Sequence, residues 1–457
     1  MTLGEVAAAI GAELWPQMAD IEVVAVSTDS RRLIPGSLFF ALKGERFDGH
    51  DYVQHAAARG ARAAVVQRDV AANLPLLRVP DTLAALGHLA RAYRRSLPAK
   101  VAAITGSVGK TTTHLMAASI FARHFNALIP PENYNNEIGV PLAILAAEQS
   151  TAALVLELAM RGKGQIAYLA QICQPHIGAI TRIGVTHIGL LGSLDDIAQA
   201  KAELLSALPA DGRAVLNADD RYFSFLAQRA PCPVLSFGLD NPADVFAENL
   251  LLRGAEGSQF TLRIGENSVA VDLRAPGRHN VANALCAAAV AHAAGVPLAE
   301  IAAGLAHFRP AALRSEILHT ASGTTILCDA YNASPESVAA ALDLLASLDC
   351  SGLRYAVLGD MLELGEHAPQ LHRAVGQLVA HSSVNRLICL GQASENIARA
   401  ACDAGMAADS VWHCSSHDDV VRLLRQLLRP GDLVLVKGSR AMRMETIIRQ
   451  IAGESYG

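Results

Sequence analysis

The chain contains 457 residues, a length that predicts about three domains of roughly 150 residues each and excludes one small disulfide-stapled module. Hydrophobic residues make up 51% and charged residues 18%, below the roughly 25% of an average soluble protein, which excludes a disordered chain. The net charge is -5, with no block of like charges, so we expect no nucleic-acid groove, and we expect a monomer with small-molecule partners.

The first predicted unit, residues 1–80, is a small α/β domain. It opens with a short helical pattern, continues with a strand-like run at 21–26, and has a second apolar run after the turn at Pro35-Gly36. Residues 55–66 have the pattern of a helix that leads into a strand.

The second predicted unit, residues 81–313, repeats a strand, a glycine turn and a helix, which predicts a mostly parallel sheet covered by helices. Its strands are expected in the apolar runs that begin at Val101, Ala153, Ile177 and Ala214. The uncharged stretch 281–299 predicts a buried helix rather than a membrane span, because it is rich in alanine, contains Asn283 and His292, and breaks at Gly295.

The third predicted unit, residues 314–457, has strand-like runs that end in Gly or Asp, the pattern of a doubly wound, Rossmann-like domain. These runs begin at Thr325, Tyr355, Arg386 and Leu433. The predicted fold class is therefore α/β with three domains, and ligands are expected at the carboxyl ends of the strands.

The cysteines and the amino terminus predict where the protein acts. Eight cysteines are spread along the chain without a C-x-x-C pair, which is typical of reduced thiols in a protein interior. The first ten residues lack the basic region of a signal peptide. We therefore expect a cytoplasmic protein that is not exported.

The sharpest local motif is T-G-S-V-G-K-T-T-T at 105–113, which follows an apolar strand and precedes a helical pattern. Gly106 and Gly109 allow backbone amides to close around phosphate oxygens, Lys110 adds a positive charge, and the hydroxyl of Thr111 is a ligand for Mg²⁺. Ile104 occupies the first glycine position of the usual phosphate-loop pattern, so a loop for another anion is the alternative.

Three further residues gain meaning from their order after this loop. Glu157 ends the next strand, where a carboxylate reaches a nucleotide-bound Mg²⁺, although a lone Glu at a strand end is usually a solvated terminus. Taken alone, His187 is a loop histidine and Lys201 a surface lysine on an amphipathic helix.

The ordered set of motifs resembles the Mur ligases, ATP-dependent amide ligases that build the peptide of bacterial cell-wall precursors. The resemblance covers nearly the whole chain. It rests on D-S-R at Asp29, P-G-S-L-F-F-A-L-K-G at Pro35, D-G-H at Asp48, T-G-S-V-G-K-T-T at Thr105, N-Y-N-N-E-I-G-V-P-L at Asn133, G-R-H-N-V-A-N-A-L at Gly277, L-R-S-E at Leu313, D-A-Y-N-A-S-P-E-S at Asp329, L-G-D-M-L-E-L-G at Leu358 and V-K-G-S-R at Val436.

The resemblance implies an ATP site and two Mg²⁺ ions. Thr111 and Glu157 would hold the ATP-bound ion, while His187 and Lys201, which is carbamylated by CO₂ in this family, would help to place a second ion. Asn280 and Asn283 would meet the adenine, Asp329 the ribose, and Arg314 the phosphates. The residues implied to bind ATP are Thr105, Gly106, Ser107, Val108, Gly109, Lys110, Thr111, Thr112, Asn280, Asn283, Arg314 and Asp329.

The resemblance also assigns the other substrates to domains. Residues 1–80 would grip a UDP-sugar through Ser30, Arg31, Asp48 and His50. Asn135 and Asn136 would lie near its peptide arm. The third domain would bind the incoming dipeptide through Asp360, Lys437 and Arg440.

The implied reaction joins D-alanyl-D-alanine to a UDP-N-acetylmuramoyl-tripeptide through an acyl phosphate. The alternatives are a sister ligase that adds the third amino acid, a folylpolyglutamate synthase, and a non-enzymatic nucleotide switch. The D-N-P-R loop usual in the diamino-acid ligase and the N-K-x-D motif of guanine-binding switches are both absent. Two positions depart from the family pattern: Gln165 stands where Glu is frequent, and Arg182 where Asn is common.

Overall fold

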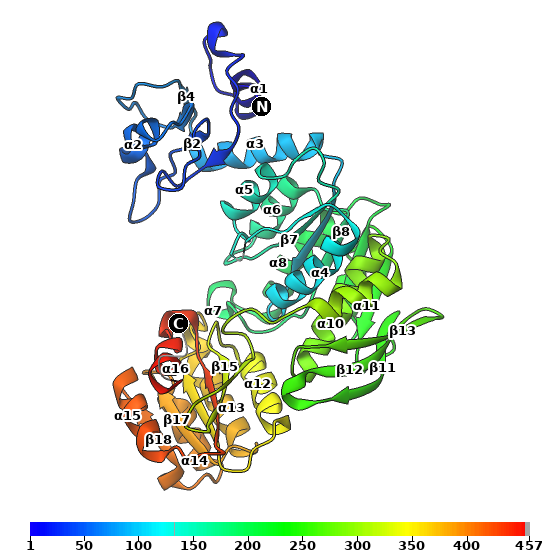
Figure 1. The fold of residues 1–457 in the computed structure, drawn as a ribbon, viewed down its shortest axis with the longest axis vertical. Helices are drawn as coiled ribbons and strands as arrows, with labels where there is room; N and C mark the ends of the chain where they lie inside the picture. The colour runs from blue at the N-terminus through cyan, green and yellow to red at the C-terminus, as the bar shows by residue number, and fades with distance from the viewer. Residues whose placement is uncertain (132, 453–457) are drawn as a thin grey trace.

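The computed structural model describes residues 1–131 and 133–452, which form three α/β domains arranged along the long axis of the molecule (Figure 1). Each domain has its own sheet. The fold class predicted from the sequence is confirmed.

The amino-terminal domain contains a four-stranded parallel sheet in the order β1-β2-β3-β4. Its elements are α1 (Leu3–Ile10), β1 (Val26–Ser27), β2 (Leu38–Phe40), α2 (Val53–Ala58), β3 (Ala63–Val66) and β4 (Leu76–Arg78), with 3-10 turns at Pro16–Met18 and Gly49–Tyr52. The strand expected at 21–26 is wrong for most of its length. The amide of Val23 bonds to Met1 and that of Val24 to Gly36, so the extended chain has scattered partners instead of a ladder.

The long helix α3 (Thr82–Ser96) connects this sheet to the rest of the molecule. It begins at Asp81, whose carboxylate accepts hydrogen bonds from the amides of Leu83 and Ala84. Helix α3 packs against α1 on one side and against the central helices α5 and α6 on the other. Figure 1 shows it as the bridge between the upper domain and the central one.

The central sheet has nine strands in the order β13-β12-β11-β10-β9-β8-β5-β7-β6. The strands are β5 (Lys100–Thr105), β6 (Ala127–Leu128), β7 (Ala153–Glu157), β8 (Ile177–Ile180), β9 (Arg213–Asn217), β10 (Val234–Gly238), β11 (Val245–Leu252), β12 (Ser258–Ile264) and β13 (Asn267–Leu273). Strands β5 to β11 pair in parallel, as expected, but β12 and β13 add an antiparallel edge that the sequence analysis missed.

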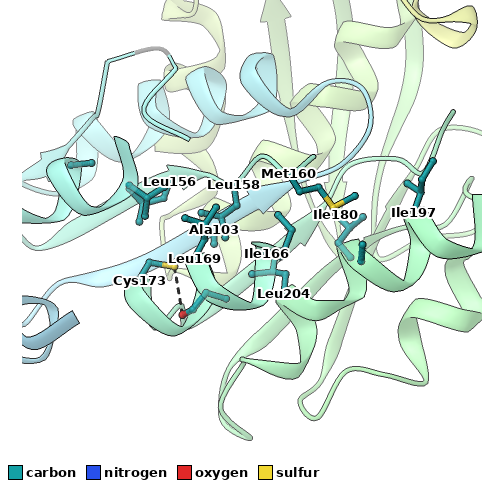
Figure 2. Packing of buried hydrophobic residues seen from close by; sticks show 14 of the residues in the cluster. Ala103, Leu156, Leu158, Met160, Ile166, Leu169, Cys173, Ile180, Ile197 and Leu204 are labelled. Carbon is teal, nitrogen blue, oxygen red and sulfur yellow. Dashed lines mark hydrogen bonds between the residues drawn. The ribbon is translucent and has the colours of Figure 1, made fainter. Parts of the chain in front are cut away.

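Helices cover both faces of this sheet. They are α4 (Lys110–His124), α5 (Gly139–Leu145), α6 (Gln165–Cys173), α7 (Ile188–Leu191), α8 (Leu194–Ser206), α9 (Phe223–Ala227), α10 (Arg278–Ala293) and α11 (Leu298–His307), with a 3-10 turn at Gly254–Glu256. Figure 2 shows side chains of β5, β7 and β8 packed against those of α6 and α8. The opposite face is covered by α4, α10 and α11. The uncharged stretch forms the buried helix α10, and among the described residues no helix has the length and apolar character of a membrane span.

The carboxyl-terminal domain has a six-stranded sheet in the order β14-β15-β19-β16-β17-β18. Its elements are β14 (Glu316–His319), β15 (Thr325–Asp329), α12 (Pro335–Ser347), β16 (Arg354–Gly359), α13 (Ala368–Ala380), β17 (Arg386–Leu390), α14 (Glu395–Asp403), β18 (Val411–Cys414), α15 (His417–Leu427), β19 (Leu433–Lys437) and α16 (Glu445–Ala452), with 3-10 turns at Gly365–His367, Ala408–Ser410 and Arg440–Met442. All strands pair in parallel except β14, an antiparallel edge strand that the sequence analysis also missed.

Candidate active site

The loop between β5 and α4 contains two glycines at which any side chain would clash with neighbouring atoms. Gly106 has φ +149°, and a Cβ atom there would lie 1.9 Å from the Thr181 hydroxyl oxygen. Gly109 has φ +82°, and its Cβ would lie 2.3 Å from Oδ1 of Asn283. The amide of Ser107 donates to the carbonyl of Arg182 at 2.7 Å, which ties the loop to the end of β8. The backbone thus has the close approach that a phosphate-binding loop requires.

Lys110 and Glu157 form the charged centre of the site. The Glu157 side chain is buried at the end of β7, where Asn135 donates a hydrogen bond of 2.9 Å to Oε1. Burial would raise the pKa of Glu157, but the charge of Lys110 and the hydrogen bonds from Thr111 and Asn135 hold it below its ordinary value. Burial lowers the pKa of Lys110, and the charge of Glu157 opposes that shift. The carboxylate is therefore ionised beside a cation.

Lys201 is buried on the inner face of α8, with 2% of its surface exposed, so it is not the surface lysine of the sequence-only interpretation. Burial lowers its pKa well below the ordinary value of 10.5, the charge of Lys110 lowers it further, and Glu157 acts in the opposite direction. The charges of Lys110 and Glu157 thus act on Lys201 from the same site. A neutral amine is therefore more accessible here than at an ordinary lysine.

His187 precedes α7 in a left-handed conformation, with φ +67°. Its Nδ1 atom lies 2.5 Å from Oε2 of Glu363, a residue of the carboxyl-terminal domain. Burial lowers the pKa of His187, while the charge of Glu363 opposes the shift. Sequence reasoning missed this pairing because the two residues come from different domains.

The donor set fits Mg²⁺ in its chemistry. In the described part of the chain no three His, Cys, Asp or Glu side chains gather as a ready metal site. The expected ligands are of other kinds, since Thr111 supplies a hydroxyl and Lys201 would need a carbamate to supply an oxygen. Glu157 is the ionised oxygen donor next to Thr111, as its hydrogen bond with that hydroxyl indicates.

The carboxyl-terminal domain completes the phosphate end of the site. Nη2 of Arg314 donates to the Thr111 hydroxyl at 3.1 Å, and the guanidinium carbon lies 3.8 Å from the centre of the Tyr331 ring. The Tyr331 hydroxyl donates to Oδ1 of Asn133 at 2.5 Å, back in the central domain. Both neighbours of Arg314 in the chain, Leu313 and Ser315, have positive φ values of 64° and 51°. The surrounding contacts must hold this unusual backbone in place.

A cavity of about 330 Å³ lies between the two domains and contains most of the predicted ATP residues. Asn280 donates to the carbonyl of Pro276 at 2.7 Å, and Asn283 donates to Asn280 at 3.2 Å, so α10 presents both amides in a fixed arrangement. Lys437 donates to Asp329 at 2.5 Å and to the carbonyl of Asn332 at 2.9 Å. The predicted ATP residues that line this cavity are Ser107, Val108, Gly109, Lys110, Thr111, Thr112, Asn280, Asn283, Arg314 and Asp329.

A second cavity, of about 650 Å³, adjoins the first. Asn135, Thr186 and Tyr331 line both cavities, so a ligand in one meets a ligand in the other. The second cavity also contains His187 and two of the residues predicted for the peptide substrates, Asn136 and Arg440.

Some predicted substrate residues lie elsewhere. Asp360 is buried behind the strand ends, accepts a hydrogen bond of 2.7 Å from the amide of Ser394, and lines neither cavity. Lys437 lines the first cavity, not the second. Their roles towards the dipeptide stay predictions.

The four residues predicted for the UDP-sugar lie together in the amino-terminal domain. Asp48 accepts from the amide of His50 and contacts Nδ1 of its ring at 2.5 Å, and Nε2 of His50 accepts from the amide of Gln67. The carboxylate of Asp29 binds Arg31 with two hydrogen bonds of 2.9 Å, and Ser30 contacts His55. They line neither cavity, so a ligand would have to extend from this domain to the central one.

The structure adds residues that the sequence analysis did not name for the site. Tyr331 and Glu336 lie within the segment D-A-Y-N-A-S-P-E-S, and His279 lies within G-R-H-N-V-A-N-A-L. Arg182, noted only as a departure from the family pattern, lines the first cavity. The motifs contained these residues, but only the approach of the two domains distinguishes them from their neighbours.

Comparison with known proteins agrees with this geometry. Residues 22–94 match the model described as Mur ligase family, catalytic domain, residues 104–291 match the Mur ligase middle domain, and residues 313–440 match the Mur ligase, glutamate ligase domain. Three domains around a phosphate loop define an ATP-dependent amide ligase, and the chain belongs to the Mur ligase family.

Individual relatives indicate which branch of the Mur ligase family this chain is similar to. The UDP-N-acetylmuramoyl-tripeptide--D-alanyl-D-alanine ligase of Escherichia coli is 36% identical over 99% of this chain and 98% of its own length. A crystal structure of MurF from Acinetobacter baumannii superposes with a TM-score of 0.90 at 33% identity, and 98% of this chain and 97% of that chain are covered. MurF of Thermotoga maritima in complex with ADP has a TM-score of 0.83 at 25% identity, with 95% of this chain and 98% of that chain covered.

Proposed function

We propose that this ligase joins D-alanyl-D-alanine to a UDP-N-acetylmuramoyl-tripeptide and converts ATP to ADP and phosphate. The relatives of highest similarity described above act in this branch or are named for it. The observation that carries the proposal is the pair of adjoining cavities between the central and carboxyl-terminal domains. One has the chemistry of a nucleotide site, and the other has room for a peptide beside it.

The reaction needs an activated acyl group, because a carboxylate is a poor electrophile at neutral pH. The terminal carboxylate of the tripeptide attacks the γ-phosphorus of ATP, the bond to the β-phosphate oxygen breaks, and ADP leaves. The dipeptide amine then attacks the acyl phosphate, phosphate departs, and the amine proton passes to solvent. Lys110 and Arg314 stabilise the negative charge on the transferred group, and the loop amides orient it.

Thr111 and Glu157 would hold one Mg²⁺, and His187 with a carbamylated Lys201 would help to place a second. Bound there, Mg²⁺ would offset the repulsion between the triphosphate and the carboxylate. The buried, low-pKa amine of Lys201 supports the carbamate, because only a neutral amine forms the N–C bond with CO₂, after which a proton is released. The product is an anionic oxygen donor in place of a cation.

The other substrates would bind on either side of this centre. Ser30, Arg31, Asp48 and His50 would hold the UDP-sugar, and Asn135 and Asn136 its peptide arm. Arg440, on the wall of the second cavity, is a cation suited to the terminal carboxylate of the dipeptide. Asp360 and Lys437 belong to the same domain but lie outside this cavity, and we propose them for the dipeptide with Arg440.

We also propose domain ranges of 1–80, 81–313 and 314–457, and a monomeric protein that acts in the cytoplasm. The cysteines support a reducing compartment, because six of the eight are thiols buried in the protein interior.

The test is a panel of amines offered with the UDP-sugar tripeptide and ATP, with ADP release and product mass as readouts. We expect product with D-alanyl-D-alanine and little with free D-alanine, glutamate or a diamino acid. Glutamate ligation would favour a folylpolyglutamate-type enzyme. Addition of a third residue to a dipeptide-bearing UDP-sugar would favour the sister ligase, and nucleotide binding without any amide product would favour a switch.

A further inference from the structure

The loop of residues 184–187, before α7, and the first turn of α7 are held by the carboxyl-terminal domain at two points. At one end, the amide of Val185 donates to Oε1 of Glu336 at 2.8 Å. At the other end, the amide of Gly189 donates to the carbonyl of Glu363 at 3.1 Å, and the Glu363 side chain contacts His187. His187 therefore lies between two anchors that belong to the other domain. Figure 1 shows α7, just after this loop, at the boundary with the lower domain.

The first anchor is a carboxylate at the start of a helix. Glu336 is the second residue of α12, after the N-cap Ser334, so the helix dipole favours its negative charge. Its other oxygen, Oε2, is enclosed and has no hydrogen-bond partner among residues 1–131 and 133–452. An enclosed carboxylate oxygen without a partner is costly, so the bond from Val185 to the other oxygen has a large share in fixing the position of this half-buried side chain.

The approach of the two domains leaves no room for side chains on the loop glycines. A Cβ atom on Gly184 would lie 2.7 Å from Oε1 of Glu336, and one on Gly189 would lie 2.3 Å from the amide nitrogen of Gly365. His187 has the left-handed conformation that non-glycine residues seldom adopt. The surroundings must maintain this conformation: Oγ of Ser107 in the phosphate loop donates to the carbonyl of Gly184 at 2.9 Å, and the anchors at Val185 and Gly189 are the contacts from the carboxyl-terminal domain.

We propose that Glu336 is a positioning residue that couples docking of the carboxyl-terminal domain to the placement of His187. When the domain docks, the Glu336 carboxylate captures the Val185 amide and orients the loop, and with it the imidazole two residues further on. The inference rests on the proposed function for the role of His187 at the reacting phosphates. The anchoring of the loop by Glu336 rests on the observed contacts alone.

Two single variants test the anchor from opposite sides. Glu336→Ala removes the acceptor, whereas Gly184→Ala keeps it and places a methyl group where the carboxylate lies. Glu336→Gln retains an oxygen acceptor for Val185. Glu395→Ala is the matched control, because Glu395 is also an acidic residue in the first turn of a helix of the same domain but pairs with Arg399 at the surface.

The expected result is a fall in kcat of roughly 10-fold to 100-fold for Glu336→Ala and Gly184→Ala, since each removes one hydrogen bond to a charged group. The KM for ATP should stay within about twofold, because the residues assigned above to ATP are unchanged in these variants. Glu336→Gln should stay near wild type, and the double variant should be no worse than Glu336→Ala alone, because both changes break the same contact. Hydrogen exchange of the 184–189 amides in the ADP complex should be faster in Glu336→Ala than in wild type.

Wild-type kcat in both single variants, additive losses in the double variant, or equal exchange rates would each overturn the proposal. So would equal losses in kcat for Glu336→Ala and the Glu395→Ala control. If the wild-type enzyme adds no dipeptide, the proposed function fails, while the exchange measurement still decides whether Glu336 holds the loop.

Discussion

At the scale of single residues, the site is defined by an imbalance of buried charge. Lys110 and Lys201 share one buried carboxylate, Glu157, and the charge of Lys110 lowers the pKa of Lys201. Two positive charges that act on one another in a medium of low dielectric constant repel. The imbalance is relieved by anionic phosphate beside Lys110 or by conversion of Lys201 to an anion.

Replacement of Lys110 tests the phosphate end of this cluster. We expect Lys110→Ala to lower turnover by at least roughly 10³-fold, because the charge that stabilises the transferred phosphoryl group is lost. ADP release, with circular dichroism to check folding, measures the effect. Lys100→Ala is the control, since Lys100 lies at the start of β5, the strand that leads into the phosphate loop, and donates to the carbonyl of Ala294 away from the site. Comparable losses in the two variants would contradict the assignment.

Lys201 offers a chemical signature besides activity. Protein equilibrated with carbon-labelled bicarbonate should give a carbamate signal in the NMR spectrum, and Lys201→Ala should lack it. The signal should weaken as the pH falls, because protonation removes the neutral amine that binds CO₂. Lys201→Ala should be nearly inactive, with partial recovery in acetate, whose carboxylate replaces the lost ligand. A labelled spectrum without a carbamate signal would refute the modification.

At the scale of helices and strands, continuous apolar runs were the predictable part of the fold. Strands β5, β7, β8 and β9 are fully buried in their interiors, and such strands stand out in sequence. The antiparallel edge was missed because its strands lack a continuous apolar run, and β11 has a register shift around Asn249, whose φ is +52°. Only the alternation in β12 was a usable signal.

The contacts of the site were less predictable than its motifs. The phosphate loop could be found locally, because its glycines, lysine and threonine are adjacent in sequence. The burial of Lys201 had a local signal that the sequence analysis did not use, since the residues three and four positions away on α8 are apolar and place the lysine on the buried face. Contacts such as Glu363 with His187 depend on the relative placement of two domains, which no local pattern encodes.

One buried cation joins the elements at the base of the central domain. Arg94 near the end of α3 donates to the carbonyls of Cys173, Leu97 and Ala99 at 3.0 to 3.2 Å. Arg94→Met would leave these acceptors unsatisfied, so we expect a loss of about 2–4 kcal/mol in the free energy of unfolding. Urea denaturation measures it. The exposed neighbour Arg95 is the control, and a loss in Arg95→Met as large as that in Arg94→Met would contradict this role.

At the scale of the whole molecule, the site exists where two domains meet. Arg314, Tyr331 and Asn133 form a chain of contacts across the boundary. Tyr331→Phe keeps the ring under Arg314 but loses the hydrogen bond to Asn133. We expect this variant to need roughly 3-fold to 10-fold more nucleotide to bring half of the molecules to the closed arrangement of the two domains, since one hydrogen bond between them is lost. Small-angle X-ray scattering during an ADP titration measures closure, and an unchanged titration curve would show that the bond has no part in it.

The central claim is that ATP activates the carboxylate of the tripeptide for attack by the dipeptide. The most direct measurement uses tripeptide whose terminal carboxylate carries isotopically heavy oxygen, with mass spectrometry of the phosphate and the amide product. The account predicts one heavy oxygen in each released phosphate. It also predicts an amide product whose mass exceeds that of the tripeptide substrate by the mass of the added dipeptide unit. Phosphate without label, or labelled phosphate without the dipeptide product, would contradict it.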